Sequence, residues 1–217
     1  MSSTFSLARL NEAALSFHLL PPAQIEQQRR LWAFADFLQQ QNAVAEVVVG
    51  MNNLTVFACN SAHIAALSEL METSWHTIQA ADYQGKHIEI PVQYGGEFGM
   101  DLAEVAEFHG ITPEEVIARH TAPIYTVFMM GFQAGFPYLG GLPEHLHTPR
   151  RAVPRTQIAA GSVGIGGSQT GVYPFASPAG WQILGRTLLP LFDAQQSPPT
   201  LLSAGDTVQF VAEKVIL

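Results

Sequence analysis

The chain has 217 residues, of which 47% are hydrophobic and 13% charged, and its net charge at pH 7 is −8. So much apolar sequence supports a sizeable core and argues against disorder. The negative charge argues against binding of bulk nucleic acid, whose phosphates are neutralised by a basic surface. No stretch approaches the run of about 18 apolar residues that a membrane-spanning helix needs.

The beginning of the sequence and its single cysteine favour the cytoplasm. The opening MSSTFSLARLNEAALSF lacks the basic start and long apolar block of a secretory signal. Cys59 has no second cysteine with which to form an internal disulfide. We expect it to be a small buried hydrophobe in the run LTVFAC, because no basic neighbour lowers the pKa of its thiol.

The first part of the chain predicts a small α+β fold. A strand is expected near residues 5–10, and apolar residues recur at helical spacing over residues 23–40. Two β-branched runs separated by the turn-forming residues Gly50 to Asn53 predict a hairpin over residues 44–58. Ser61 is the expected cap of a second helix. This pattern indicates a small sheet with helices on one face.

The next part is expected to mix strands with short helices. Residues 87–92 alternate as a strand, and residues 124–130 form a second β-rich run. Between them, a helix over residues 101–109 should end at Gly110. Thr112 should cap another helix, because a proline and a glutamate follow at the positions that a capped helix favours.

From residue 131 onward glycine and proline dominate. Residues 131–186 hold 11 of the 18 glycines and six prolines, so short strands and tight turns are expected there. A strand, a turn and a closing strand are expected over residues 201–211. We therefore predict an antiparallel barrel or sandwich. The chain divides into a small α+β N-terminal domain, 1–86, and a mostly β domain, 87–217, that carries the site.

The same segment has an unusual local charge. Residues 131–186 contain four arginines, one acid and no lysine, a local balance of +3. Arginine without lysine favours forked recognition of a carboxylate, a phosphate or an amide oxygen. The alternative is that these side chains cap carbonyl groups and pair with acids of the other domain. The four arginines are Arg150, Arg151, Arg155 and Arg186.

A glycine-rich stretch, GSVGIGGS, covers residues 161–168. Glycines let backbone N–H groups surround an anion in a concave nest, but a tight turn in a β-barrel is an equally good interpretation. A phosphate-binding loop would need a lysine where Gly167 stands. The dinucleotide fingerprint is also absent, because Gln169 occupies the position of its third glycine.

Histidine, serine and metal chemistry receive less support. His145 and His147 lie beside Glu144, but no second cluster completes a metal site, and we predict none. His147 is a candidate general acid or base, because histidine titrates near neutral pH. A structural histidine that donates to a carbonyl group is an equal alternative. Ser162 is a candidate hydrogen-bond donor rather than a nucleophile, because no Gly-x-Ser-x-Gly motif occurs.

Aromatic side chains surround the arginines and glycines, and most should pack in the core or at the rim of a barrel. Tyr138, Tyr173 and Trp181 carry polar groups and flank glycines, so they are better candidates for lining a cleft. The other aromatic residues of this stretch are Phe132, Phe136 and Phe175.

Several motifs occur in order along the chain: GMNNLTV, IPVQYGGEFGMDL, GFQAGFPYLGG, LHTPRR and GSVGIGGSQTGVYP. Together they resemble the allophanate hydrolase subunit 1, or KipI-like, family over nearly the whole chain. Three positions depart from the usual pattern: Met100 and Ala134 stand in place of proline, and Ala179 in place of glycine. The resemblance implies a cyclophilin-like β-barrel in the C-terminal half.

LHTPRR and GSVGIGGSQTGVYP are most similar to the branch of that family that opens 5-oxoproline, a cyclic amide, to glutamate with hydrolysis of ATP. The resemblance therefore implies one component of an ATP-dependent cyclic amide hydrolase (5-oxoprolinase). ATP with magnesium would be a co-substrate of the complex, and no cofactor is expected in this chain. A larger C subunit would be the direct partner and an A subunit would complete the activity, so the chain alone should be inactive. Nucleic acid and membrane are not expected partners.

The resemblance also implies that three groups of residues act at one site. The residues that would hold the substrate carboxylate or phosphate, or move protons, are Arg150, Arg151, Arg155 and His147. The hydrogen-bond donors would be Ser162, Gly164 and Gly166. The residues that would line the pocket are Tyr173, Trp181 and Gln182.

Two other functions are open. A KipI-like regulatory protein that inhibits a sensor histidine kinase would need an exposed apolar patch rather than a cleft. A component of a urea- or allophanate-type carboxyltransferase or amidohydrolase would share the cleft, but it would need biotin machinery that this chain lacks.

Overall fold

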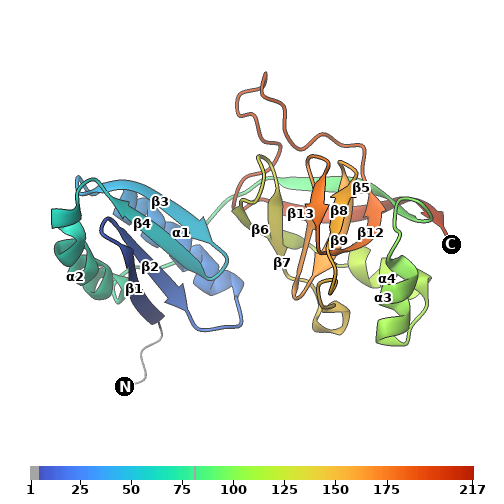
Figure 1. Ribbon diagram of the computed structural model, residues 1–217, viewed down its shortest axis with the longest axis horizontal. Helices are drawn as coiled ribbons and strands as arrows, with labels where there is room; N and C mark the ends of the chain where they lie inside the picture. The colour runs from blue at the N-terminus through green and yellow to red at the C-terminus, as the bar shows by residue number, and fades with distance from the viewer. Residues whose placement is uncertain (1–4, 81) are drawn as a thin grey trace. The chain divides into compact units, whose positions relative to one another are not determined.

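The computed structural model describes residues 5–80 and 82–217. The chain forms two compact units, Met1–Tyr83 and Gln84–Leu217, which we describe separately. The first is a small sheet with helices and the second is a closed β-barrel with few helices (Figure 1). The predicted fold class, α+β followed by a mostly β barrel, is confirmed. None of the helices in the described residues has the length and apolar character that crossing a bilayer requires.

The sheet of the first unit is antiparallel, with the strand order β1-β2-β4-β3. The sequence pattern does not predict β2, because no glycine or proline marks the turn before it. Instead the Asn11 side chain closes this turn by accepting a hydrogen bond from the Ala13 N–H at 2.8 Å. The strands are β1 Phe5–Asn11, β2 Ala14–Leu19, β3 Val44–Gly50 and β4 Asn53–Ala58.

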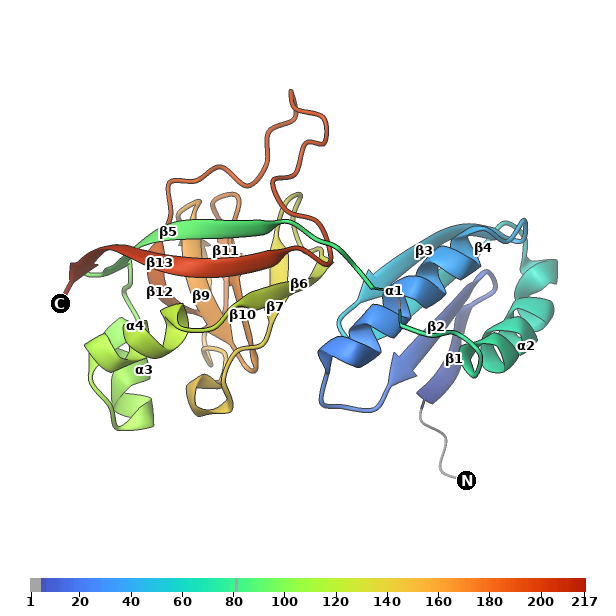
Figure 2. The ribbon, with the colours of Figure 1, turned by 180° about the vertical axis from the view of Figure 1, so that it is seen from behind.

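Two helices, α1 Ile25–Gln39 and α2 Ile64–Trp75, share one core with this sheet. Figure 2 shows α1 lying across β3 and β4. Phe17 of β2 contacts Phe34 of α1 and Trp75 of α2, with ring centroids 5.3 and 4.9 Å away. Burial of these large rings stabilises the unit by far more than the helix propensity of either segment.

The segment between β4 and α2 corrects two predictions. Asn60, rather than Ser61, caps the 3₁₀ turn Ser61–His63 that leads into α2, because its side chain accepts a hydrogen bond from the Ala62 N–H at 2.9 Å. Cys59 is exposed and is not a buried hydrophobe. It follows the buried last residue of β4, and the alternation of side chains along a strand turns Cys59 away from the core.

Seven strands of the second unit close into a barrel with the order β10-β7-β6-β13-β5-β12-β9. All neighbours pair antiparallel except β5 and β13, which run parallel. The antiparallel prediction is wrong for this pair, because it joins the first and last barrel strands and no local pattern reports such a distant pairing. The barrel strands are β5 His87–Gly95, β6 Tyr125–Met130, β7 Pro137–Gly140, β9 Ser162–Gly166, β10 Gln169–Val172, β12 Gln182–Arg186 and β13 Thr207–Ile216. A separate pair consists of β8 Arg155–Ile158 and β11 Ser177–Ala179.

Two short helices, α3 Leu102–His109 and α4 Pro113–Thr121, lie side by side against the barrel (Figures 1 and 2). Gly110 ends α3 with a φ of 64°, a left-handed value that favours glycine. Thr112 caps α4 by accepting a hydrogen bond from the Glu115 N–H at 3.3 Å. Both helix ends are as predicted.

Buried polar side chains form a hydrogen-bond network around His120 in the barrel unit. The Tyr94 hydroxyl lies 2.8 Å from Nδ1 of His120, and Oγ1 of Thr170 lies 2.9 Å from Nε2. Because Thr170 donates its own proton to the Gly164 carbonyl, it accepts from Nε2, and Tyr94 must then donate to Nδ1. Burial lowers the pKa of His120 to about 3, so the ring is neutral at pH 7.

We expect His120 to make the stability of the chain sensitive to mild acid. The unfolded chain binds a proton at this position below about pH 6.5, whereas the folded chain does so only below about pH 3. The free energy of unfolding therefore contains the full contribution of neutral His120 above about pH 6.5. Below that pH it falls by up to about 1.4 kcal/mol per pH unit. Urea unfolding at about pH 7.5 and about pH 5 measures this loss.

The matched variant for this measurement is His120→Gln, which keeps one acceptor and one donor but does not titrate. Its free energy of unfolding should change less between the two pH values than that of the wild type. His145→Gln, which removes an exposed histidine, should keep the wild-type dependence. Equal pH dependence in His120→Gln and wild type would contradict the prediction.

Candidate functional site

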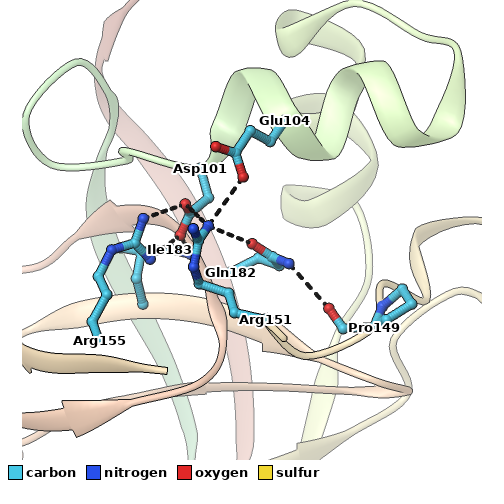
Figure 3. A network of polar contacts seen from close by, with 7 residues as sticks. All are labelled: Asp101, Glu104, Pro149, Arg151, Arg155, Gln182 and Ile183. Carbon is cyan, nitrogen blue, oxygen red and sulfur yellow. Dashed lines mark hydrogen bonds and ion pairs between the residues drawn. The ribbon is translucent and has the colours of Figure 1, made fainter. Parts of the chain in front are cut away.

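A buried carboxylate, Asp101, organises the arginine-rich part of the barrel unit (Figure 3). Its Oδ1 accepts hydrogen bonds from Arg151 Nη1 at 2.7 Å and from Arg155 Nη2 at 2.6 Å. Its Oδ2 accepts from Arg155 Nη1 at 2.8 Å and from the Ile183 N–H at 2.7 Å. The forked contact with Arg155 is the bidentate geometry that makes arginine–carboxylate pairs strong. One side chain thus joins the start of α3 to β8, to β12 and to the segment that carries Arg151.

This pairing gives two of the predicted arginines partners within the fold. Arg151 also contacts Oε2 of Glu104 at 3.0 Å, so two guanidinium groups meet two carboxylates and their charges cancel. Hydrogen bonding to the Asp101 carboxylate raises the pKa of Arg155. Arg151 and Arg155 are therefore already paired within the fold, which favours a structural role, and their binding of the substrate's anion stays a prediction. Arg186 follows the alternative and donates from Nε to a backbone carbonyl at 2.8 Å.

Sequence reasoning missed Asp101. The available signal was an acidic residue at the first position of the helix predicted over residues 101–109, which suggests a helix cap. The structure shows no cap hydrogen bond from this side chain. Its partners come from distant parts of the chain, and only the barrel closure brings them together.

Arg150 differs from its two neighbours. Among the described residues, no carboxylate forms an ion pair with its guanidinium. Arg150 is exposed, and its guanidinium carbon lies 5.9 Å from the ring centroid of Trp181. It also lines both of the hollows described next. Of the three arginines predicted to hold an anion, Arg150 is the one whose charge remains available.

The larger hollow has a volume of about 430 Å³ and lies beside α3. Its wall includes Arg150, Arg151, Gln182 and Phe108 of α3. Gln182 is held in place by donating from Nε2 to the Pro149 carbonyl at 3.1 Å. The Asp101 network therefore forms one wall of this hollow through Arg151.

The smaller hollow, of about 220 Å³, also borders Arg150, and we call it the aromatic hollow. Its aromatic residues are Phe132, Phe136, Tyr138, Tyr173 and Trp181. Three of them are buried and meet edge to face, with ring centroids between 5.0 and 6.1 Å apart. Burial raises the pKa of both tyrosine hydroxyls, so each keeps its proton at neutral pH.

The structure thus gathers the three aromatic residues that the sequence favoured as cleft-lining, together with two phenylalanines. Phe175 is not among them and contacts Phe192 instead. Ala179, one of the departures from the family pattern, also lines the aromatic hollow.

The glycine-rich stretch is not an anion nest. Gly164 lies in β9 opposite Gly171 of β10 and Ile183 of β12, and Gly166 lies opposite Gln169 of β10, so both glycines take part in strand pairing. Gly167, with a φ of 66°, and Ser168 form the two-residue turn between β9 and β10. The tight-turn interpretation therefore holds, and donation by Gly164 and Gly166 to a substrate stays a prediction. Gly166 makes room instead, because a Cβ there would lie 2.4 Å from Nε1 of Trp181.

Ser162 and His147 are also engaged within the fold. The Ser162 hydroxyl is buried and donates to the Ala159 carbonyl at 2.8 Å. Nε2 of His147 lies 3.0 Å from the Leu142 carbonyl oxygen and donates to it, as in the structural alternative. Neither residue lines either of these two hollows, and their roles at a substrate stay predictions. In the part of the chain that the structure describes, no group of three or more histidine, cysteine, aspartate or glutamate side chains is placed to hold a metal.

Comparison with known proteins gives this arrangement a context. The sequence matches the family described as carboxyltransferase domain, subdomain C and D, over residues 5–202. A protein from Haemophilus influenzae, named as the B subunit of 5-oxoprolinase, is 58% identical over 212 residues, which cover 98% of this chain and 100% of that relative. A protein of the same name from Escherichia coli O157:H7 is 47% identical over 206 residues, 94% of each chain. Kluyveromyces lactis urea carboxylase superposes on 98% of this chain and 22% of its own with a TM-score of 0.80, and at 18% identity this likeness concerns the fold alone.

We expect loss of Asp101 to destabilise the protein strongly. Asp101→Ala leaves two guanidinium groups and the Ile183 N–H without their acceptor, and breaking a buried pair costs about 3–5 kcal/mol. Because Arg151 and Arg155 keep some contact with water, we expect about 2–4 kcal/mol in urea unfolding. Glu104→Gln is the control: its side chain is 63% exposed, so the loss should stay below about 1 kcal/mol. Similar losses in both variants would show that Asp101 does not organise the site.

We expect Gly166→Ala to displace the Trp181 indole, because the added methyl group would overlap it. The fluorescence emission of tryptophan should shift, and overpacking should reduce the free energy of unfolding by about 1–3 kcal/mol. Gly180→Ala is the control, since its added methyl group would lie no closer than 3.7 Å to Pro154. An unchanged emission spectrum in Gly166→Ala would refute this role of the glycine.

Proposed function

The chain belongs to the carboxyltransferase domain family of subdomains C and D, and we propose that within it the chain is the B subunit of a 5-oxoprolinase. The proposed reaction opens 5-oxo-L-proline to L-glutamate with hydrolysis of ATP. The observation that carries the proposal is the identity of more than half of this chain, over nearly its whole length, to a protein of that name.

The proposed reaction needs ATP because an unstrained amide carbonyl is a weak electrophile. In our proposal the γ-phosphoryl group of ATP passes to the amide oxygen of the lactam as its bond to ADP breaks. Water then adds to the activated carbon, the ring C–N bond breaks, and the nitrogen takes up a proton and leaves as the amine. A second water hydrolyses the resulting acyl phosphate to glutamate and phosphate.

These steps develop negative charge on oxygen atoms, which preorganised cationic and N–H or O–H donors stabilise. In this chain the unpaired guanidinium of Arg150, between two hollows, supports a site for the substrate's carboxylate. Asp101, Arg151 and Arg155 would not touch the substrate's anion. They would hold the segment that carries Arg150 in place.

The partners and conditions are part of the proposal. ATP with magnesium would be the co-substrate of a complex with a larger C subunit, the direct partner, and an A subunit, and this chain would be inactive alone. The relatives are named as one lettered component of an enzyme, which supports a multi-subunit assembly. We also propose that the enzyme works in the cytoplasm, because the unpaired Cys59 fits a reducing compartment.

The alternatives have weaker support. A urea- or allophanate-type carboxyltransferase shares the fold with this chain, and that likeness concerns the fold alone. A regulator of a sensor histidine kinase would use a surface, and it would have no need for an unpaired guanidinium beside two hollows.

Reconstitution tests the proposal. This chain mixed with the A and C subunits, 5-oxoproline, ATP and magnesium should form glutamate, and the mixture without this chain should form none. Arg150→Ala should lower kcat/KM by about 10- to 100-fold, because a hydrogen bond to a charged group contributes about 1.5–3 kcal/mol.

Arg119→Ala is the matched control, since its guanidinium pairs with Glu115 on the surface of α4 and lines neither hollow. It should keep wild-type turnover. Absence of glutamate from the complete mixture would overturn the proposed function. Wild-type turnover in Arg150→Ala would overturn the role of this arginine alone.

A further inference from the structure

The aromatic hollow carries hydrogen-bond donors that the fold does not use. Among the described residues, no hydrogen bond involves the hydroxyls of Tyr138 and Tyr173 or Nε1 of Trp181. None of these atoms is among the buried polar atoms that lack a partner, so each remains accessible. Buried tyrosine and tryptophan side chains usually find a partner for their polar atoms. The three residues that carry these donors line one apolar hollow, and such a hollow suits a ligand that offers acceptor oxygens.

Charge adds a second requirement for that ligand. Arg150 borders the hollow and makes no ion pair with a carboxylate in the described chain, whereas Arg151 and Arg155 are neutralised. Its guanidinium lies near the Trp181 ring, where it can meet a ligand seated against that ring. The complementary ligand therefore carries one anionic group beside an apolar body.

The size of the hollow limits the body of the ligand. Its volume of about 220 Å³ falls below the range of about 300–1,000 Å³ that is typical of sites for drug-sized molecules. The buried rings of Phe136, Tyr173 and Trp181 brace one another edge to face, so the wall is formed before any ligand arrives. A small ring fits these limits, and a nucleotide does not.

Phe132 stands at the rim of this hollow in an unusual backbone conformation. The φ of Phe132 is 62°, a value that residues other than glycine rarely adopt. The N–H of the following residue, Gln133, donates to the carbonyl of the preceding residue, Gly131, at 2.7 Å. This is a γ-turn with a positive φ at its centre, a rare and strained form. The ring is 60% exposed, yet it contacts Phe136 and Tyr173 at centroid distances of 5.4 and 6.1 Å. Strain of this kind is found at ligand clamps.

From these features we infer that the aromatic hollow binds a small flat ring that carries one carboxylate and an acceptor oxygen. Arg150 binds the carboxylate, the tyrosine and indole donors meet the oxygen atoms, and the exposed Phe132 ring covers the ligand. The inference rests on the proposed function, because 5-oxoproline, the proposed substrate, is a small ring with one carboxylate and an amide oxygen. It names the hollow and the rim residue that would set affinity for it.

Calorimetric titration of the full chain, in the absence of ATP, tests the inference. The probes are 5-oxoproline and 2-pyrrolidinone, which has the same ring without the carboxylate. We expect 5-oxoproline to bind about 10-fold or more tightly than 2-pyrrolidinone and to change the emission of Trp181, the one tryptophan of residues 84–217. Arg150→Gln should remove the difference between the two probes and leave 2-pyrrolidinone binding unchanged.

Phe132→Ala should lower the binding affinity for both probes by the same factor, about 3- to 10-fold. The reason is that the Phe132 ring contacts the ring of the ligand and not its carboxylate. Phe132→Leu keeps apolar bulk and should show the same direction, which guards against a folding defect in the alanine variant. Phe175→Ala is the matched control: this phenylalanine is 43% exposed in the same unit and lies outside the hollow.

Two results would overturn the inference: no binding of 5-oxoproline by the full chain, or binding that ignores both Arg150→Gln and Phe132→Ala. The outcomes also separate the inference from the proposed function. Binding as expected without turnover in the reconstituted enzyme would overturn the proposed function alone. Turnover with binding that neither substitution changes would overturn the inference alone.

Discussion

The architecture of the site depends on one carboxylate that has no contact with water. An isolated buried charge is strongly unfavourable, so Asp101 is tolerated only because four hydrogen bonds from two guanidinium groups and one backbone N–H meet it. Those donors come from three different parts of the chain. The pairing therefore acts as a tie between α3, β8, β12 and the segment of Arg151, whose own backbone N–H donates to the Gly180 carbonyl at 2.7 Å.

Because of this pairing, arginines that are close in sequence have different roles. Arg151 and Arg155 are neutralised by Asp101 and Glu104, so they give the region its shape without giving it charge. Arg150 is the residue before Arg151 and belongs to the same segment. No carboxylate of the described residues pairs with its guanidinium, which borders two hollows. Arg150 and Arg151 are adjacent, yet their roles differ because Arg151 pairs with the buried Asp101 and Arg150 does not.

The sequence patterns predicted what local chemistry determines and missed what closure of the barrel determines. The caps at Gly110 and Thr112 and the mostly β character after residue 131 follow from side-chain preferences within a few residues. The partners of Asp101 and the parallel pairing of β5 with β13 depend on contacts between distant segments, which no local pattern reports. The glycine-rich stretch was ambiguous for a related reason: the same residues suit an anion nest or a tight turn, and the pairing of β9 with β10 and β12 decides between them.

The parallel pair also has a consequence for synthesis of the chain on the ribosome. Strand β13 lies between β5 and β6, so these two early strands have no shared neighbour until residues 207–216 have been made. The first unit has all its strands and helices within residues 5–80 and can fold while the rest is still being translated. The barrel keeps open strand edges until its last strand has been made, and unpaired edges are where a nascent chain can pair with other chains.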